Sequence, residues 1–173
     1  DILKREKDGK HHGGIYHKTQ IDLTYNSNHI EGSRLTHDQT RYIFETNTIG
    51  IENEAVNVDD IIETSNHFRA IDYVIEHAEE ELTEDFIKEL HRILKTATSD
   101  SRLSWFRVGD YKSKPNTVGG APTVSPNQVC VEMQELLGWY ARIKKISFEN
   151  IVEFHHRFEK IHPFQDGNGR VGR

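Results

Sequence analysis

The sequence lacks several features that define large classes of protein. Among its 173 residues there is a single cysteine, Cys130, which excludes an internal disulfide and favours a reducing compartment. It contains no run of about 18 apolar residues, so a membrane span is not expected. It also shows no signal-peptide pattern. We therefore expect a cytoplasmic protein that has no membrane partner.

Positive charge is also scarce. Lys and Arg number 22 against 28 Asp and Glu, so the formal net charge is -6 at pH 7. Such a chain has no general attraction for nucleic acid, and any basic site must be local. With 35% hydrophobic residues, the chain can form one globular domain with a core. Because the sequence stops inside a motif, we expect it to be cut at its C-terminal end.

Apolar residues recur at helical spacing through most of the chain. After a polar N-terminal arm at 1–18, this spacing predicts mainly α structure, with no linker or repeat that would divide residues 19–173. Thr83 can cap one helix, and Ser125 with Gln128 predicts a capping box at the start of another. The last long helix ends at His162, because the following proline disfavours helical backbone. The expected helices cover 19–32, 37–45, 58–78, 84–97, 126–140 and 147–162.

One stretch departs from this helical pattern. Residues 107–124 are rich in Gly, Pro, Asn and Thr with short β-prone segments, which predicts a hairpin or structured loop. The sequence therefore indicates a helical domain with one short β excursion.

The twelve residues HPFQDGNGRVGR, from His162 to Arg173, concentrate chemistry at one corner. Gly167, Asn168 and Gly169 precede an expected helix, and exposed amides at a helix start can cradle phosphate. Arg170 and Arg173 would project from nearly the same helix face and suit a polyphosphate. A plain turn between two helices is the alternative, but it requires neither the arginine pair nor the acid beside them.

Two further residues of the corner suit phosphoryl or nucleotidyl transfer. Asp166 would repel phosphate unless a hard cation such as Mg²⁺, or Mn²⁺ in its place, lay between them. Histidine as a residue type titrates near neutrality, which allows a histidine at position 162 to serve as a general base. The corner thus offers a base, a metal ligand, an amide cradle and two cations.

These twelve residues resemble the signature of the Fic family, H-P-F-x-D-G-N-G-R-x-x-R, at every fixed position. The resemblance implies a Fic-type helical bundle with a short β-hairpin flap at about 107–124. It also implies a protein adenylyltransferase, which moves AMP from ATP to a Ser, Thr or Tyr hydroxyl of a target protein or of itself.

The resemblance assigns a role to each matching residue. It implies that His162 takes the proton of the target hydroxyl and that Asp166 holds Mg²⁺. Phe164 would anchor the loop in the core. The α- and β-phosphates would lie on Gly167, Asn168, Gly169 and Arg170, the γ-phosphate would meet Arg173, and the flap would contribute Val118, Gly119, Gly120 and Ala121 to the binding site.

A second motif lies near the start of the chain. Ser27 to Gly32, SNHIEG, is by itself a helix end, with glycine as the left-handed stop. It is similar to the inhibitory motif of the same family, [S/T]-x-x-x-E-[G/N], through Ser27, Glu31 and Gly32. The resemblance implies that Glu31 pairs with Arg173 and so blocks the γ-phosphate position.

Other functions remain open from the sequence. Some relatives transfer UMP, phosphate or phosphocholine, and a non-catalytic binding module could use the flap as an edge for a partner strand. His155, Glu159 and His162 fall at i, i+4 and i+7, so a helix face that binds Zn²⁺ is a further alternative.

Overall fold

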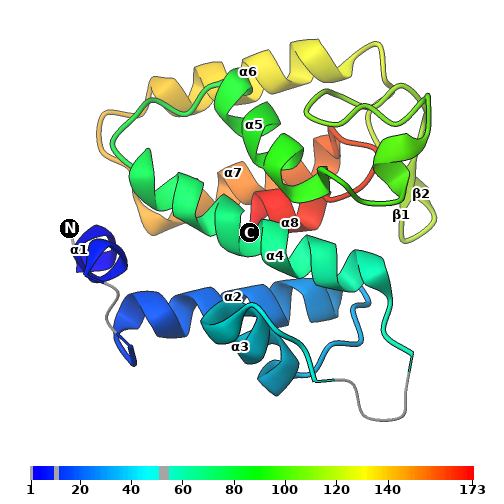
Figure 1. Ribbon diagram of the computed structural model, residues 1–173. Coiled ribbons are helices and arrows are strands. Elements are labelled where there is room, and N and C mark those ends of the chain that lie inside the picture. Colours follow the sequence, from blue (N-terminus) through cyan, green and yellow to red (C-terminus); the bar gives the residue numbers. More distant parts are fainter. Residues whose placement is uncertain (1, 10–11, 51–54) are drawn as a thin grey trace. The chain divides into compact units, whose positions relative to one another are not determined.

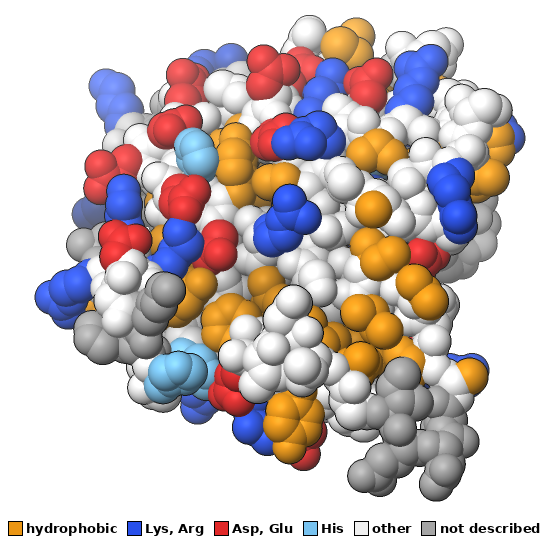
Figure 2. Space-filling view, viewed as in Figure 1, with side chains coloured by type: hydrophobic (Ala, Val, Ile, Leu, Met, Phe, Trp, Pro, Cys, Tyr) orange, Lys and Arg blue, Asp and Glu red, His pale blue; other side chains and the backbone are white. Residues whose placement is uncertain are grey.

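The computed structural model describes residues 2–9, 12–50 and 55–173. Helices dominate these residues, together with one two-stranded antiparallel sheet, which confirms the expected fold class (Figure 1). The chain forms two compact units, Asp1–Glu80 and Glu81–Arg173. No described helix combines the length and the apolar character needed to cross a membrane. Charged side chains of both signs are interspersed over the face drawn in Figure 2.

The described residues of the first unit form four helices. They are α1 (Ile2–Asp8), α2 (Ile15–Ile30), α3 (His37–Thr46) and α4 (Val58–Glu76). Within the polar N-terminal arm, residues 2–8 form the helix α1. Leu3 on α1 packs against a small cluster formed by Tyr16, Ile71 and Ile75, so apolar burial holds this short helix against α2 and α4.

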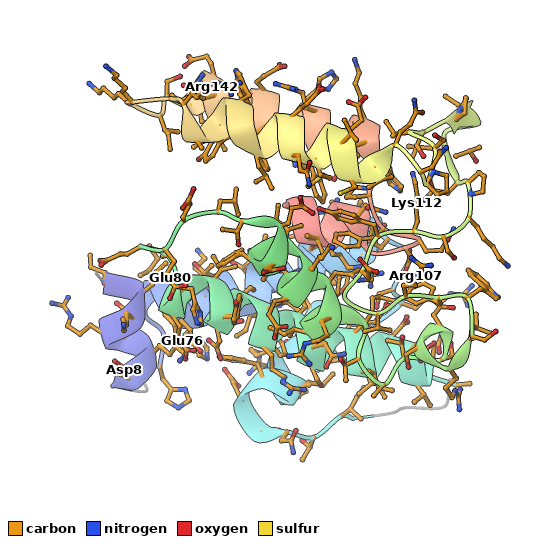
Figure 3. The ribbon with its side chains drawn as sticks, turned by 90° about the horizontal axis from the view of Figure 1, so that it is seen from above. Asp8, Glu76, Glu80, Arg107, Lys112 and Arg142 are labelled. Atoms are coloured by element: carbon orange, nitrogen blue, oxygen red, sulfur yellow. The ribbon has the colours of Figure 1, made fainter. Side chains whose placement is uncertain are left out.

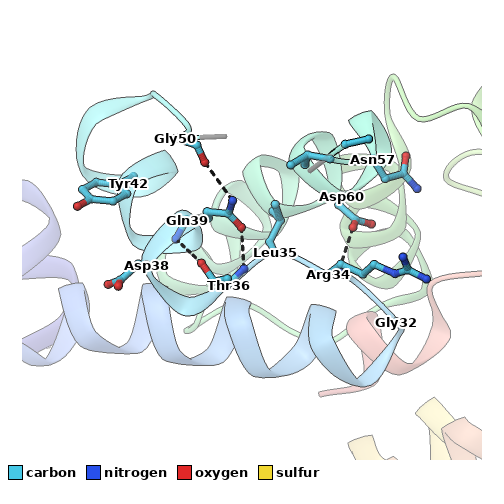
Figure 4. Close-up of a pocket in the computed structure, with 12 residues that line it drawn as sticks. Gly32, Arg34, Leu35, Thr36, Asp38, Gln39, Tyr42, Gly50, Asn57 and Asp60 are labelled. Atoms are coloured by element: carbon cyan, nitrogen blue, oxygen red, sulfur yellow. Dashed lines mark hydrogen bonds between the residues drawn. The ribbon is translucent and has the colours of Figure 1, made fainter. Parts of the chain in front are cut away.

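The helix start at His37 follows from local hydrogen bonding. The Thr36 hydroxyl accepts from the Gln39 N–H at 3.1 Å, and the Gln39 side chain accepts from the Thr36 N–H at 2.9 Å (Figure 4). This reciprocal pair satisfies two backbone donors at the N-terminus of α3. Beside it lies a cavity of about 790 Å³, and Gly32, Leu35 and Asp60 are among the residues that line it.

The second unit carries the signature corner. Its elements are α5 (Glu84–Lys95), a 3₁₀ turn (Asp100–Arg102), β1 (Thr117–Val118), β2 (Ala121–Pro122), α6 (Val129–Ala141), α7 (Phe148–Ile161) and α8 (Asn168–Gly172). Val129, Met133 and Leu136, which stand at i, i+4 and i+7 of α6, are fully buried, as expected for the core face of a helix. The core of this unit consists of Ile87, Tyr111, Val129, Met133, Leu136, Phe158, Ile161 and Phe164.

Two local details of this unit bear on the sequence predictions. The short strands pair within the expected flap, and Gly119 and Gly120 both have positive φ, as a tight hairpin turn requires. The helix predicted from 126 starts only at Val129. The predicted capping box fails because the Ser125 hydroxyl donates to the Gln128 side chain at 2.6 Å.

Candidate active site

The signature begins where α7 ends. Ser147 and Asn150 form a capping box at the start of this helix, and its last residue is Ile161. His162 then adopts the left-handed conformation, with φ 52° and ψ 61°. Pro163 disfavours helical backbone at the residue before it, and positive φ is costly for a residue that has a Cβ. The turn therefore fixes His162 in a strained backbone conformation, which is common at functional sites.

Phe164 anchors the loop in the core, as the sequence predicted. Its side chain is fully buried, and its ring stacks on His91 with 4.0 Å between centroids and 4° between planes. The Asn168 side chain holds the loop together by binding the backbone of Phe164. Its Oδ1 accepts from the Phe164 N–H at 2.7 Å, and its Nδ2 donates to the Phe164 carbonyl at 2.8 Å. Because the Asn168 side chain is engaged in this way, its backbone is the part that can face a phosphate.

Two glycines of this segment lie where a Cβ would meet neighbouring side chains. Gly167 has φ +80°, and a Cβ there would lie 3.2 Å from a methyl carbon of Leu94. A Cβ on Gly172 would lie 2.6 Å from Glu159 Oε1. Alanine at either position would force its neighbours to move, so these glycines allow α8 to approach α5 and α7 closely (Figure 1).

Asp166 lies between two cations. Its Oδ2 accepts from Lys95 Nζ at 2.7 Å and from Arg170 Nη2 at 3.2 Å. The Lys95 side chain is 2% exposed and that of Asp166 is 45% exposed, so the carboxylate links a buried ammonium to the surface. Burial acts to raise the pKa of Asp166, but the charge of Lys95 and its hydrogen bond outweigh this, and the pKa is lowered. Asp166 is therefore an anion at neutral pH.

His91 supports the loop and was missed in the sequence. Its Nδ1 accepts from the Gly109 N–H at 3.0 Å, because a backbone N–H can only donate. The proton consequently sits on Nε2, which donates to the Asp166 carbonyl at 3.2 Å. Burial lowers the pKa of His91 to about 4, so the ring is neutral. This neutral tautomer joins α5 and the segment after it to the backbone beside Asp166.

Lys112 is a second buried lysine that the sequence analysis missed. It lies in the segment between α5 and α6 that includes the flap (Figure 3). Its Nζ donates to the His162 carbonyl at 2.8 Å, the Asn116 side chain at 2.8 Å and the Thr123 hydroxyl at 2.6 Å. It also donates to the Ile161 carbonyl at 3.3 Å. Burial lowers its pKa to about 8. One ammonium thus binds the base of the flap to the carbonyl of His162.

The backbone strengthens this connection. The Lys112 N–H donates to the Pro163 carbonyl at 2.9 Å, and the Asn116 side chain donates to the Phe164 carbonyl at 3.0 Å. The flap residues Val118, Gly119, Gly120 and Ala121 lie beyond these contacts and are exposed. The hairpin therefore has a fixed base and an accessible tip.

The side chains around His162 weaken the zinc alternative. His162 Nδ1 lies 3.7 Å from Glu159 Oε2, while His155 Nδ1 donates to the Gly172 carbonyl at 3.0 Å. His155 is thus engaged with α8. Within the described residues, the group of three ligand atoms close enough to share a metal is found elsewhere, so the proposed set of His155, Glu159 and His162 is not assembled.

The second motif lies at the end of α2 in the first unit. Ser27 is 1% exposed, Glu31 is exposed and directly follows the last helical residue, and Gly32 has φ +97°. The Ser33 N–H donates to the Asn28 carbonyl at 3.0 Å, which closes the helix end. The predicted glycine stop is confirmed. Glu31 and Arg173 belong to different units, and their pairing stays a prediction.

A family model supports the resemblance seen in the signature. The Fic/DOC family model matches residues 81–173, the whole of the second unit. A curated relative, protein adenylyltransferase fic-1 of Caenorhabditis elegans, is 26% identical over 166 residues, which cover 90% of this chain and 30% of the relative. Protein adenylyltransferase Fic of Nematostella vectensis is 27% identical, covering 86% and 34%. The chain spans about a third of the length of these relatives.

Solved structures agree on the fold. A Fic domain containing signaling protein from Bacteroides thetaiotaomicron has a TM-score of 0.77 and 32% identity, covering 98% of this chain and 62% of that one. Fic-1 from C. elegans has a TM-score of 0.73 at 21% identity and shows the fold alone. Both similarities extend over nearly the whole described chain.

Proposed function

Since the chain belongs to the Fic/DOC family, we propose that it is a protein adenylyltransferase, which moves AMP from ATP to a hydroxyl of a target protein or of itself. The observation that carries this proposal is the segment from His162 to Arg170, where a histidine and a carboxylate lie in the turn between α7 and α8 and a guanidinium follows on α8. The names of the curated relatives support the same activity.

In the proposed reaction, His162 acts as the general base. It takes the proton of the target hydroxyl while that oxygen forms a bond to the α-phosphorus of ATP and the bond to the β-phosphate oxygen breaks. Pyrophosphate leaves with the bonding electrons. Lys112 donates to the His162 carbonyl and so holds the left-handed backbone of His162. This backbone conformation fixes the position from which the imidazole projects. Positioning of this kind accounts for much of the rate in phosphoryl transfer.

Asp166 is the residue proposed to hold Mg²⁺. A single half-exposed carboxylate suits this ion, which takes one or two carboxylates together with phosphate oxygens and water. The bound ion would neutralise phosphate charge. Lys95 and Arg170 already contact the same carboxylate oxygen, so this chain's own cations balance Asp166 without the metal. When the nucleotide and Mg²⁺ bind, the Asp166 carboxylate would then contact both Lys95 and the ion.

The phosphates are proposed to bind along the start of α8. Gly167 and Gly169 allow close approach to the backbone, and Asn168 contributes its backbone because its side chain closes the loop. Arg170 would reach the phosphates from its position beside Asp166. Arg173 is exposed and would meet the γ-phosphate, and the flap tip at Val118–Ala121 would hold the target segment or the nucleotide.

We further propose that the enzyme inhibits itself. Glu31 follows α2 in the first unit and Arg173 follows α8 in the second, and an ion pair between them would remove the cation that the γ-phosphate needs. Transfer of UMP, phosphate or phosphocholine is the second candidate function, since the base pocket is not defined by the signature.

The test is incorporation of labelled AMP into protein, measured on a Glu31→Gly background so that self-inhibition cannot hide activity. Adding His162→Ala should reduce incorporation by about 10²–10⁴-fold, the usual cost of removing a general base. His156→Ala is the matched control, because His156 is an exposed histidine on the same helix. Undiminished incorporation by the His162→Ala protein would refute the mechanism. Incorporation from UTP or a phosphocholine donor, but not ATP, would select the second candidate.

A further inference from the structure

Three potential metal ligands meet in the first unit, away from the signature corner. His12 lies in the turn before α2, His17 in the first turn of α2, and Glu45 near the end of α3. One ligand atom from each lies within 4.8 Å of the other two. The rings of His12 and His17 have centroids 5.4 Å apart. Three segments of the chain therefore direct donor atoms to one point.

The central ligand is poorly satisfied without a further partner. His17 Nε2 is buried and has no hydrogen-bond partner in the described part of the chain, although Glu45 Oε1 is only 2.9 Å away. The two atoms are close, but their directions do not meet as in a hydrogen bond. A buried polar atom left in this way costs free energy. A cation shared by the nitrogen and the oxygen would remove that cost.

Neighbouring side chains hold two of the three ligands in position. Arg41 Nη1 donates to Glu45 Oε2 at 3.2 Å, which leaves Oε1 directed at His17. The His17 ring packs edge-on against Phe44, with centroids 5.6 Å apart. Outer contacts that orient ligands in this manner accompany most protein metal sites. His12 is exposed, so its ring can adjust when an ion binds.

The chemistry of the set selects the metal. Two imidazoles and one carboxylate are ligands that Zn²⁺ uses with a water in the fourth position, whereas Ca²⁺ and Mg²⁺ prefer oxygen alone. Tetrahedral Zn²⁺ with bonds of about 2.0 Å spaces its ligand atoms roughly 3.3 Å apart. That spacing lies between the 2.9 Å pair and the 4.8 Å limit found here. Small side-chain movements would therefore complete the site.

We propose that His12, His17 and Glu45 bind one divalent transition-metal ion of the Zn²⁺ type. The ion would connect the turn after α1 to the start of α2 and the end of α3. This inference is independent of the proposed transferase activity, because all three residues lie in the first unit.

The experiment uses the full chain, prepared without a histidine tag and freed of metal by dialysis. Calorimetric titration with Zn²⁺ should give one equivalent, and Co²⁺ should give the visible absorption of a four-coordinate ion. At free Zn²⁺ about 100 times the dissociation constant, the unfolding equilibrium should shift about 100-fold toward the folded state and the melting temperature should rise.

Matched variants identify the ligands. His12→Gln, His17→Gln and Glu45→Gln should each weaken Zn²⁺ binding at least tenfold, with circular dichroism confirming that each variant folds. The control is His37→Gln, since His37 also contacts a carboxylate, Asp22, at 2.9 Å, but among the residues that the structure describes no third ligand joins this pair. His37→Gln and His162→Ala should bind as wild type. The proposal is overturned if the wild-type chain does not bind Zn²⁺, or if binding survives His17→Gln and Glu45→Gln. Loss confined to His12→Gln also overturns it, because the His11–His12 pair would then be the site.

Discussion

Replacing Lys112 with Met should change how stability depends on pH. The ammonium donates to the carbonyls of Ile161 and His162 and to two flap side chains, yet it faces neutral acceptors throughout. Burial therefore lowers its pKa from 10.5 to about 8. Methionine keeps a straight, flexible side chain of similar length while it removes both the charge and the donors.

The size of the effect follows from proton linkage. Below pH 8 Lys112 is charged in both states, so the full cost of burying the charge is present, about 3 kcal/mol at 1.36 kcal/mol per pH unit. Between pH 8 and 10.5 the unfolded chain binds more protons than the folded one, so stability rises with pH. From pH 7 to pH 10 the wild-type chain should gain about 2.5 kcal/mol from this residue.

The substitution also removes hydrogen bonds, and this opposes the relief of the buried charge. The two carbonyls left without the ammonium should cost about 1–3 kcal/mol each. At pH 7 the wild-type chain buries the Lys112 charge and the Met variant does not, and this difference offsets most of the loss of hydrogen bonds. The Lys112→Met variant should therefore be less stable than wild type by only about 0–3 kcal/mol. At pH 10 the offset is mostly gone and the deficit should grow by about 2.5 kcal/mol.

The assay is urea unfolding of both proteins at pH 7, 8, 9 and 10. Because the difference between them is followed, titration of other groups cancels. A growth of about 2.5 kcal/mol corresponds to roughly 1 M in the midpoint difference for a protein of this size. Lys114→Met is the matched control, since it removes the charge of an exposed lysine two residues away. A difference for Lys112→Met that stays constant from pH 7 to pH 10 would refute the account of Lys112 as a buried charge.

Two further predictions concern the proposed enzyme. Glu31→Gly should raise AMP incorporation by on the order of 10²-fold, because a nucleotide displaced by about 1 Å loses that much rate. Glu31→Gln should behave similarly if charge matters, Ser27→Ala should release less, and equal rates for wild type and Glu31→Gly would remove the inhibitory pairing. Incorporation should also disappear in excess chelator and return with Mg²⁺ or Mn²⁺, and activity that persists in the chelator would contradict the metal role of Asp166.

The parts of the site that could be predicted are those set by local sequence. The turn at His162 follows from the next proline, and Phe164 was expected in the core. Lys95 and Lys112 could not be identified in this way, because lysine is normally a surface residue. Their burial depends on acceptors far along the chain, Asp166 for one and the carbonyl of His162 for the other. The same holds for His91, whose tautomer is set by its hydrogen bonds to Gly109 and Asp166.

Fold predictions failed where a local signal competed with another. Ser125 and Gln128 have the spacing of a capping box, but the hydroxyl donates to the side chain instead of accepting from the backbone, and α6 starts later. At the N-terminus, the polar residues 1–18 predicted an arm, yet residues 2–8 form α1. Leu3 on this helix packs against the cluster of Tyr16, Ile71 and Ile75, a tertiary contact that local sequence does not indicate.

The division into two units gives the proposed inhibition a thermodynamic consequence. The residues proposed as base, metal ligand and phosphate cradle all belong to the second unit, while Glu31 belongs to the first. If Glu31 lowers ATP affinity by occupying Arg173, linkage requires that ATP weaken the pairing by the same factor. Bound nucleotide would then oppose the association of Glu31 with the corner. Self-inhibition of this kind is reversible by substrate, so its strength depends on nucleotide concentration as well as on the two charges.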